Sequence, residues 1–534
     1  MKKILSYMVC VVLIAAFTSC EDFLQKDPTD VPSQSVFWQQ KSHFDSALAG
    51  TYSVLHHSIF STQMPRLECL SDNTVEDNQS IATGNLTPNT STFVEDIYNN
   101  SYEGIARVHT ILHQLDIYGG LDISADDEKF IRAQCYALRG YFYAWLYQCY
   151  REVPLVTELL TVENMYHPKA SREDIKAQII SDYDYAINNL PNTLYTDSKT
   201  AGRFTVSAVK ALKARILLFD GYDEKGNAKP EVMNEVVQLL KSIDKYDAGC
   251  LMPRTRDNFL NQYQGSSSEI MFSVKFLRPT LTHNMDQYYG GWYIEMPVQD
   301  LIDAFECTDG LKWSESPLAV KPDYAKLYDT SISQEDRRIE REKFFINRDE
   351  RLVDAVVNGG ITNYVRDGGE DKDVTVHTGY SLTGYCTKKL GQPYDSPADY
   401  STISDQDVVI VRYAHVLLML AEAENELNGP SSTALDAVNA VRNRSHQPSI
   451  SNNISKDELR ERIRNEWRVE TCFEGLRYFQ LKQWKIMEQC LNGAEDPAYK
   501  GYVKTYQPAF EYFPIPQAEI DKANGVLVQD PYYQ

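Results

Sequence analysis

The stretch that decides the fold begins VVIVRYAHVLLMLAEAENELN, from Val408 to Asn428. Its apolar residues recur three and four positions apart, at Tyr413, Val416, Leu420, Ala423 and Leu427. That spacing places them on one face of an α-helix. Gly429 and Pro430 then end the helix, because glycine adopts positive φ easily and proline cannot continue a helix.

Three further amphipathic patterns follow as far as Met487. Ser431 or Ser432 caps the second predicted helix, and Ser455 with Glu458 forms a capping box at the start of the third. Gly475 separates the third helix from a fourth. Four amphipathic helices joined by short turns bury their apolar faces against one another, so this region is predicted to be an array of helix pairs.

The same region resembles the C-terminal signature of the SusD/RagB family. The motifs that carry the resemblance are RYAHVLLMLAEAE (412–424), AVNAVR (437–442), EWRVETCFEGLRYF (466–479), Trp484 and YFPIPQ (512–517), followed by Glu519 to Asp521. They span roughly the last quarter of the chain. His415 and Gln480 stand where the family is expected to have aspartate, and both are expected at surface or interface positions.

The resemblance implies a fold and a biological role. Members of this family are outer-membrane lipoproteins that capture nutrients, mostly glycans, for a SusC-like TonB-dependent transporter. Their helices form a split, tetratricopeptide-like array. We expect no cofactor and no catalytic residue, since the sequence has no Gly-x-Ser-x-Gly, no phosphate-binding glycine-rich loop and no Gly-x-Gly-x-x-Gly motif.

The N-terminus has the pattern of a lipoprotein signal. Lys2 and Lys3 precede an apolar run, and Thr18 and Ser19 precede Cys20. We expect residues 1–19 to be removed and Cys20 to be lipidated, which would anchor the protein at the cell surface of the outer membrane. The alternative is cleavage by the ordinary signal peptidase, which would leave a free periplasmic protein.

Composition excludes several classes of partner. The formal net charge of −22 disfavours nucleic acid, and it favours neutral glycans over polyanionic ones unless a local basic patch is present. The cysteines beyond Cys20 are scattered without a Cys-x-x-Cys motif, so we expect small buried hydrophobic residues and no metal site.

The chain divides into regions by its periodicity. After the signal (1–19) and a tether (20–40), residues 41–246 and 408–534 are predicted to form helical-pair regions. Residues 247–407 are predicted to be an inserted, irregular, loop-rich subdomain with short strands, among them Glu269–Phe276. Together residues 20–534 form one mainly α-helical unit. Ser61 to Thr92 is polar and is predicted to be a long irregular excursion.

Candidate catalytic groups are few. His109 and His113 have the spacing of a zinc-binding helix but lack the glutamate of the zinc-protease motif, so we expect two ordinary helix residues. Glu466 and Glu470 share a helix face, whereas glycosidase carboxylates face each other across a cleft. We expect ion pairs between these glutamates and Arg412, Arg464, Arg468 and Arg477, and no catalytic activity.

Aromatic residues outside the helical patterns are the candidates for ligand binding. Tyrosine and tryptophan offer a flat apolar face and a hydrogen-bonding edge, which suit a sugar ring. The resemblance indicates two stretches, Tyr288–Tyr293 and Ser61–Tyr98. The ligand-binding residues we predict are Tyr288, Tyr289, Trp292, Tyr293, Trp313, Asn73 and Asn78.

The sequence therefore predicts a non-enzymatic, lipid-anchored protein that binds oligosaccharides or polysaccharides and delivers them to a transporter. One alternative is a protein of the same transport system that binds peptides. Two others are a purely structural helical-repeat adaptor and a glycoside hydrolase.

Overall fold

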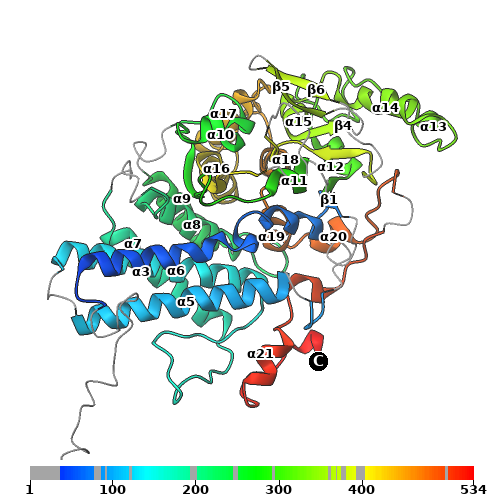
Figure 1. Cartoon of the computed structure of the whole chain (residues 1–534). Coiled ribbons are helices and arrows are strands. Elements are labelled where there is room, and N and C mark those ends of the chain that lie inside the picture. The colour runs from blue at the N-terminus through cyan, green and yellow to red at the C-terminus, as the bar shows by residue number, and fades with distance from the viewer. Residues whose placement is uncertain are drawn as a thin grey trace, which may run out of the picture.

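A computed structural model describes residues 37–76, 86–90, 93–118, 123–192, 201–243, 250–290, 295–358, 362–367, 370–374, 381–392, 403–499 and 503–534. The part of the chain so described is mainly helical, and its strands are short (Figure 1). Within it, no helix has both the length and the apolar character needed to cross a bilayer.

The N-terminal region is a stack of antiparallel helices. They are α3 (Lys41–Tyr52), α5 (Phe93–Tyr118), α6 (Ala125–Cys149), α7 (Arg172–Asn189), α8 (Val206–Phe219) and α9 (Pro230–Lys241). From α5 onward each packs against the next in chain order. The side chains of Ser124, Ser171 and Thr205 cap α6, α7 and α8, since each accepts a hydrogen bond from the backbone N–H three residues on.

The C-terminal region continues the same stack across the insertion. Its helices are α16 (Tyr413–Asn428), α17 (Ser432–Arg444), α18 (Lys456–Thr471), α19 (Arg477–Gln483), α20 (Met487–Leu491) and α21 (Gln517–Lys522). Helix α16 packs against α9 as well as against α17 and α18. The predicted split tetratricopeptide-like array is therefore confirmed, with Ser431 as the cap of α17 and Ser455–Glu458 as a capping box.

The inserted region is built from short elements. Its helices are α10 (Asn261–Gln264), α11 (Met285–Gly290), α12 (Gln299–Ala304), α13 (Tyr324–Leu327), α14 (Gln334–Glu342) and α15 (Glu350–Ala355). Most of it lies at the top of the molecule, on the side away from α5 and α21 (Figure 1).

Four antiparallel strand pairs complete the described structure. They are β1 (Thr74–Val75) with β3 (Met296–Pro297), β2 (Ile270–Val274) with β8 (Val408–Arg412), β4 (Val356–Asn358) with β7 (Tyr385–Thr387), and β5 (Thr362–Asp367) with β6 (Glu370–Val374). The apolar run before α16 is thus a strand rather than part of a helix. It runs straight into α16 and holds the predicted strand β2 against the scaffold.

The prediction of an irregular excursion from Ser61 to Thr92 is partly wrong. Residues 64–70 form the 3₁₀-helix η3 (Met64–Leu70), which packs against α19 and is almost wholly buried. The helix is buried through its apolar residues Met64, Leu67 and Leu70. The polar composition of the whole stretch had suggested that it would be exposed. Residues 77–85 and 91–92 of this stretch lie outside the described residues.

Gly475 sits where the backbones of η3 and the α18–α19 turn meet. Its φ is +74°, and a Cβ on it would lie 2.6 Å from the carbonyl oxygen of Met64. We expect Gly475→Ala to destabilise the protein by about 1–3 kcal/mol from backbone strain, with the clash adding to that. Urea unfolding followed by circular dichroism measures the loss.

The matched control for this substitution is Gly50→Ala in α3. A Cβ on Gly50 would have no atom within 4 Å, and alanine favours a helix by about 0.5–1 kcal/mol over glycine. Equal stability of the Gly475→Ala and Gly50→Ala variants would contradict the close approach of η3 to Gly475.

A buried ion network joins the insertion to the C-terminal helices. Its centre is Arg412, which is fully buried and contacts Glu269, Glu470 and Glu474 at 2.6–2.7 Å. Among the described residues, the network contains six carboxylates, of Glu269, Glu306, Asp349, Glu466, Glu470 and Glu474, and six Lys and Arg cations, of Arg351, Lys389, Arg412, Arg442, Arg444 and Arg462. Charge is therefore balanced within the network.

The network corrects part of the predicted pairing. Glu470 does pair with Arg412, but its other partners are Arg351 and Arg444, and Glu466 pairs with Arg351 and Arg442. Arg468 and Arg477 bind Asp72 instead, and Arg464 binds Glu461. Spacing along one helix reveals neighbours within that helix, whereas most of these partners come from other parts of the chain.

Candidate functional site

The β1–β3 pair joins one stretch predicted to bind ligand, Ser61–Tyr98, to the segment that directly follows the other, Tyr288–Tyr293. In its antiparallel register Val75 lies opposite Met296, so the next residues outward, Glu76 and Glu295, are at the same end of the ladder. Glu76 is the last described residue before 77–85, and Glu295 is the first after 291–294. The pairing thus brings together the ends of two segments that are far apart in sequence.

Three of the predicted ligand-binding residues are buried, which corrects the expectation that they are exposed. Tyr289 has no exposed surface, and its hydroxyl donates to the carbonyl of Thr62 at 3.1 Å. Asn73 is also fully buried; its amide donates to Glu68 and accepts from Arg468. Both side chains fix the framework beneath the β1–β3 end rather than its outer surface.

Trp313 is buried too, with 5% of its surface exposed. Its ring packs against Phe344 at 5.0 Å, and Lys321 and Arg348 lie over it at 4.5 and 5.8 Å. These neighbours come from other segments of the insertion, so no local pattern around Trp313 signals its burial. A ring covered in this way has no free face for a sugar.

The remaining candidates stay predictions. Tyr288, in α11, is half-buried, so part of its ring is accessible. Trp292, Tyr293, Asn78 and the predicted lipidation site Cys20 lie outside the described residues.

The β1–β3 end contains buried acidic residues that sequence reasoning missed. Glu68 and Glu295 are both fully buried; Thr74 donates to one Glu295 oxygen at 3.1 Å, and the other oxygen has no partner among the described residues. Burial, together with the nearby Glu68 carboxylate, raises the pKa of Glu295 well above its ordinary value. Burial also raises the pKa of Glu68.

We expect Glu295→Gln to stabilise the protein at neutral pH. Because the folded-state pKa of Glu295 is raised, the folded protein holds a proton that the unfolded chain releases above about pH 4.5. Wild-type stability therefore falls by about 1.4 kcal/mol per pH unit from there until the pH reaches the folded-state pKa. The advantage of the glutamine variant should be largest at pH 7–8 and vanish near pH 4.

Urea unfolding of both proteins from pH 4 to 8 measures this difference. The exposed Glu163→Gln serves as the control and should show no such trend. An advantage of Glu295→Gln that is the same at every pH would contradict a raised pKa for Glu295.

The other candidate sites have structural roles. His109 is buried and bonds to the carbonyl of Val156, whereas His113 is exposed. No group of residues suited to hold a metal ion exists in the described ranges. Six of the cysteines there are buried, which confirms their prediction as small hydrophobic residues; Cys250 is exposed and Cys490 is partly buried.

His415 and Gln480 are buried rather than at the surface, which corrects the expectation for both. The ring of His415 bonds to Glu474 at 2.9 Å and to Arg215 at 3.1 Å. Burial lowers the pKa of His415 to about 4, against the opposing pull of Glu474. A neutral imidazole therefore stands inside the scaffold where the family is expected to have aspartate.

The fold and the β1–β3 end define a class of protein: a helical-repeat scaffold that holds a loop-built surface. Two protein-family models match this chain. Residues 256–533 match the SusD family, and residues 22–218 match a family described as starch-binding and associating with the outer membrane. The chain belongs to the SusD family.

Individual relatives agree with this assignment over nearly the whole chain. The chain is 23% identical to SusD-like protein P38 of Formosa agariphila, covering 90% of this chain and 91% of that protein. A crystal structure of a SusD-like protein from Bacteroides fragilis has a TM-score of 0.74 at 24% identity, covering 95% of this chain and 100% of the other. A laminarin-binding SusD-like protein has a TM-score of 0.67 at 19% identity, covering 93% of this chain and 100% of the other.

Proposed function

We propose that this protein is a cell-surface, lipid-anchored glycan-binding protein that passes oligosaccharides to a SusC-like TonB-dependent transporter. The observation that carries the proposal is the β1–β3 pairing, because it joins the ends of the two segments with the predicted ligand residues. Trp292 and Tyr293 would stack on sugar rings, and Tyr288 and Asn78 would complete the site. Membership of the SusD family and the laminarin-binding neighbour support a carbohydrate ligand.

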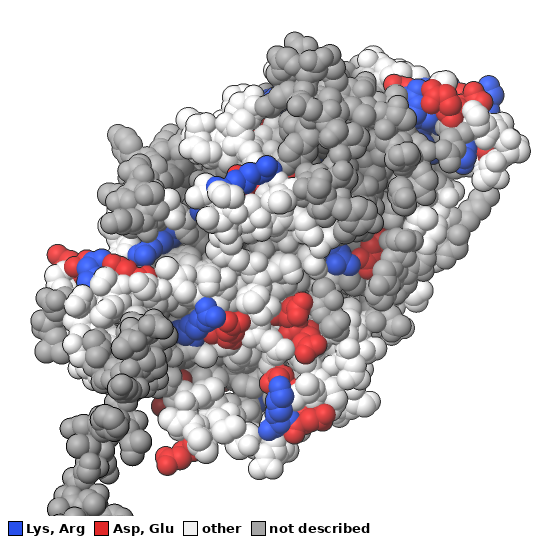
Figure 2. All heavy atoms as spheres, in the orientation of Figure 1, with Lys and Arg blue, Asp and Glu red and all other residues white. Residues whose placement is uncertain are grey.

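The charge of the molecule favours a neutral glycan. The net charge is −22, and on the face shown in Figure 2 basic and acidic side chains lie in mixed groups rather than in one large basic patch. A polyanionic chain would meet net repulsion on such a surface. We therefore place neutral glucans ahead of uronate or sulfated polymers as ligands.

We also propose that the protein is non-catalytic. Glu466 and Glu470, the pair that shares a helix face, are buried and bound to arginines. Neither carboxylate faces a cleft in which a sugar could lie between two acids. Incubation with each candidate glycan followed by chromatography should release no product; any released sugar would favour the glycoside hydrolase alternative.

Isothermal titration calorimetry with laminarin, starch, alginate and a peptide pool tests the ligand class. We expect binding to a neutral glucan, and a Trp292→Ala, Tyr293→Ala double variant should bind at least about tenfold more weakly, since stacking contributes on the order of 1 kcal/mol per ring. Tyr166→Ala, which changes an exposed tyrosine elsewhere, is the control and should bind normally. Unchanged binding by the double variant would remove these two residues from the site.

The other outcomes separate the alternatives. Binding of peptides alone would favour the peptide-binding alternative, and the absence of any small ligand would favour a structural adaptor. Cys20→Ala tests the anchor: the variant should leave the membrane fraction, and its persistence there in detergent partitioning would contradict lipidation at Cys20.

A further inference from the structure

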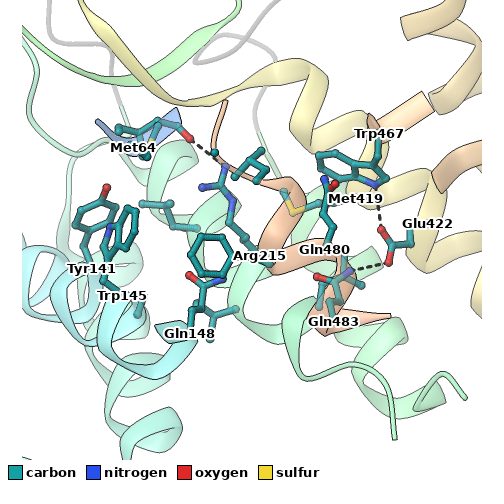
Figure 3. A pocket seen from close by; sticks show the side chains of 18 of the residues that line it. Met64, Tyr141, Trp145, Gln148, Arg215, Met419, Glu422, Trp467, Gln480 and Gln483 are labelled. Atoms are coloured by element: carbon teal, nitrogen blue, oxygen red, sulfur yellow. Dashed lines mark hydrogen bonds between the residues drawn. The ribbon is translucent and has the colours of Figure 1, made fainter. Parts of the chain in front are cut away.

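An internal cavity lies where the two halves of the helical array meet. Its volume is about 70 Å³, and its lining comes from α6, α7 and α8 on one side and from β8, α16, α18 and α19 on the other (Figure 3). That space is enough for a few water molecules or for one small ion with water. The side chain of Arg215, from α8, lies in the middle of the view.

Arg215 has no carboxylate partner. Its Nη2 donates to the carbonyl of Ile410 at 3.0 Å and contacts Nδ1 of His415 at 3.1 Å. Because the low pKa of His415 keeps the ring neutral, Nδ1 accepts this bond and Nε2 donates to Glu474. In the described part of the chain, no Asp or Glu oxygen lies within 4.0 Å of the Arg215 guanidinium, and both of these contacts are made through Nη2.

The surrounding charges do not compensate Arg215. Glu474, the acidic residue that acts on it most strongly, is bound by Arg412 and Lys389 within the balanced network of six carboxylates and six cations. Glu422, which also lines the cavity, accepts hydrogen bonds from Tyr222, Trp467, Gln483 and Trp484. Figure 3 shows Glu422 turned toward Trp467 and Gln483 rather than toward Arg215.

The same cavity contains further donors without acceptors. The hydroxyl groups of Tyr141 and Tyr183 are buried and have no acceptor among the described residues. Both tyrosines line the cavity and lie close enough to Arg215 to act on it electrostatically. Gln480 contributes an unpaired amide oxygen, for which a cavity water is a suitable partner. Arg215 is half-buried, and a cation without a carboxylate partner beside buried, unpaired donors is unfavourable.

We propose that the cavity is an anion site, in which a chloride-sized monovalent anion binds the Arg215 guanidinium together with the Tyr141 and Tyr183 hydroxyls. The anion supplies the missing negative charge and accepts the free hydrogen bonds. The ligands of the anion come from α6, α7 and α8, in the N-terminal half of the array. Because Arg215 also contacts Ile410 in β8 and His415 in α16, the anion stabilises the junction between the N-terminal and C-terminal halves. This site is separate from the proposed glycan site.

Unfolding in chloride provides the first test. An anion that binds only the folded state should raise the folded-to-unfolded ratio about tenfold for each tenfold rise in chloride above its dissociation constant. Urea unfolding is compared in sodium chloride, sodium bromide and sodium gluconate at one ionic strength, so that screening by salt is constant. Chloride and bromide should stabilise the wild type, and gluconate, which is too large for the cavity, should not.

Variants identify the residue responsible. Arg215→Met should abolish the difference between chloride and gluconate, and Tyr183→Phe should reduce it. Arg107→Met, which removes an exposed arginine, should leave it unchanged. A chloride effect that persists in Arg215→Met would overturn the proposal.

A direct test needs no variant. A crystal of the wild-type protein grown in sodium bromide should show an anomalous peak within hydrogen-bond distance of Arg215 Nε or Nη1. Water density alone at that position would also overturn the proposal.

Discussion

Replacing Arg412 by methionine should cost the protein about 3–5 kcal/mol of stability. The guanidinium is fully buried and binds the carboxylates of Glu269, Glu470 and Glu474. Methionine fills much of the space but leaves three buried carboxylates with one positive charge fewer, which is the costly way to break a buried ion pair. Since domains are stable by only about 5–15 kcal/mol, this variant should unfold at a much lower urea concentration or fail to accumulate.

The pKa values of the partners agree with this expectation. Burial alone would raise the pKa of Glu470, but its three arginine partners, Arg444, Arg412 and Arg351, lower that pKa below its ordinary value. The pKa of Glu474 is lowered in the same way by Arg412 and Lys389. Carboxylates with lowered pKa values stabilise the fold above pH 4.5, and that stability is lost as the pH falls. The wild type should therefore lose stability in acid, and Arg412→Met should lose less.

The control for Arg412→Met is Arg107→Met. Arg107 pairs with Glu103 at the surface, where both side chains are more than a third exposed, and such pairs contribute about 0–1 kcal/mol. Urea unfolding of both variants decides the matter. A stability loss below about 1 kcal/mol for Arg412→Met would contradict the importance of the network.

Replacing Trp313 by alanine should also be strongly destabilising, by about 3–5 kcal/mol, because it removes a large buried ring. The lost contacts are with Phe344 and with Lys321 and Arg348 over the ring faces. We expect the opposite pattern for Trp292→Ala, with weaker glycan binding and little change in stability. Thermal unfolding and calorimetry on both single variants separate the two roles.

One outcome would contradict the burial of Trp313. If the Trp313→Ala variant were as stable as the wild type but no longer bound glycan, the ring of Trp313 would belong to the ligand site. Trp313→Phe provides a milder variant, since it keeps an aromatic ring against Phe344. It should recover most of the stability.

The difference between these tryptophans shows where sequence reasoning succeeds. The scaffold could be predicted because helix stripes and caps are local: Ser455 with Glu458 and Gly429 mark helix ends within a few residues of the apolar patterns they bound. The burial of Trp313 could not, because its neighbours arrive from other segments of an irregular insertion. Strand β8 was missed for a related reason, since a short apolar run before a helix has no periodicity of its own.

The sequence indicates where the candidate ligand site lies along the chain, but it does not indicate which side chains are buried there. Strand β1, within the predicted stretch Ser61–Tyr98, pairs with β3, which follows the predicted stretch Tyr288–Tyr293 by a few residues, and whether ligand binds there stays a prediction. The buried pair of Glu68 and Glu295 gave no signal, since glutamates are normally exposed and only the fold encloses these two. Burial of Tyr289 and Asn73 follows from the same enclosure.

The balanced ion network sets a rule for engineering chimaeras. Helix α9 contacts α16 directly, so the scaffold closes across the insertion, and we expect the predicted insertion, residues 247–407, to serve as a cassette for exchange between relatives. The cassette nevertheless carries Glu269, Glu306, Arg351 and Lys389, whose partners remain behind on β8, α17, α18 and the turn that follows α18. A donor cassette without matching charges at these four positions should give an insoluble hybrid, whereas one that keeps them should transplant a new ligand specificity onto an intact scaffold.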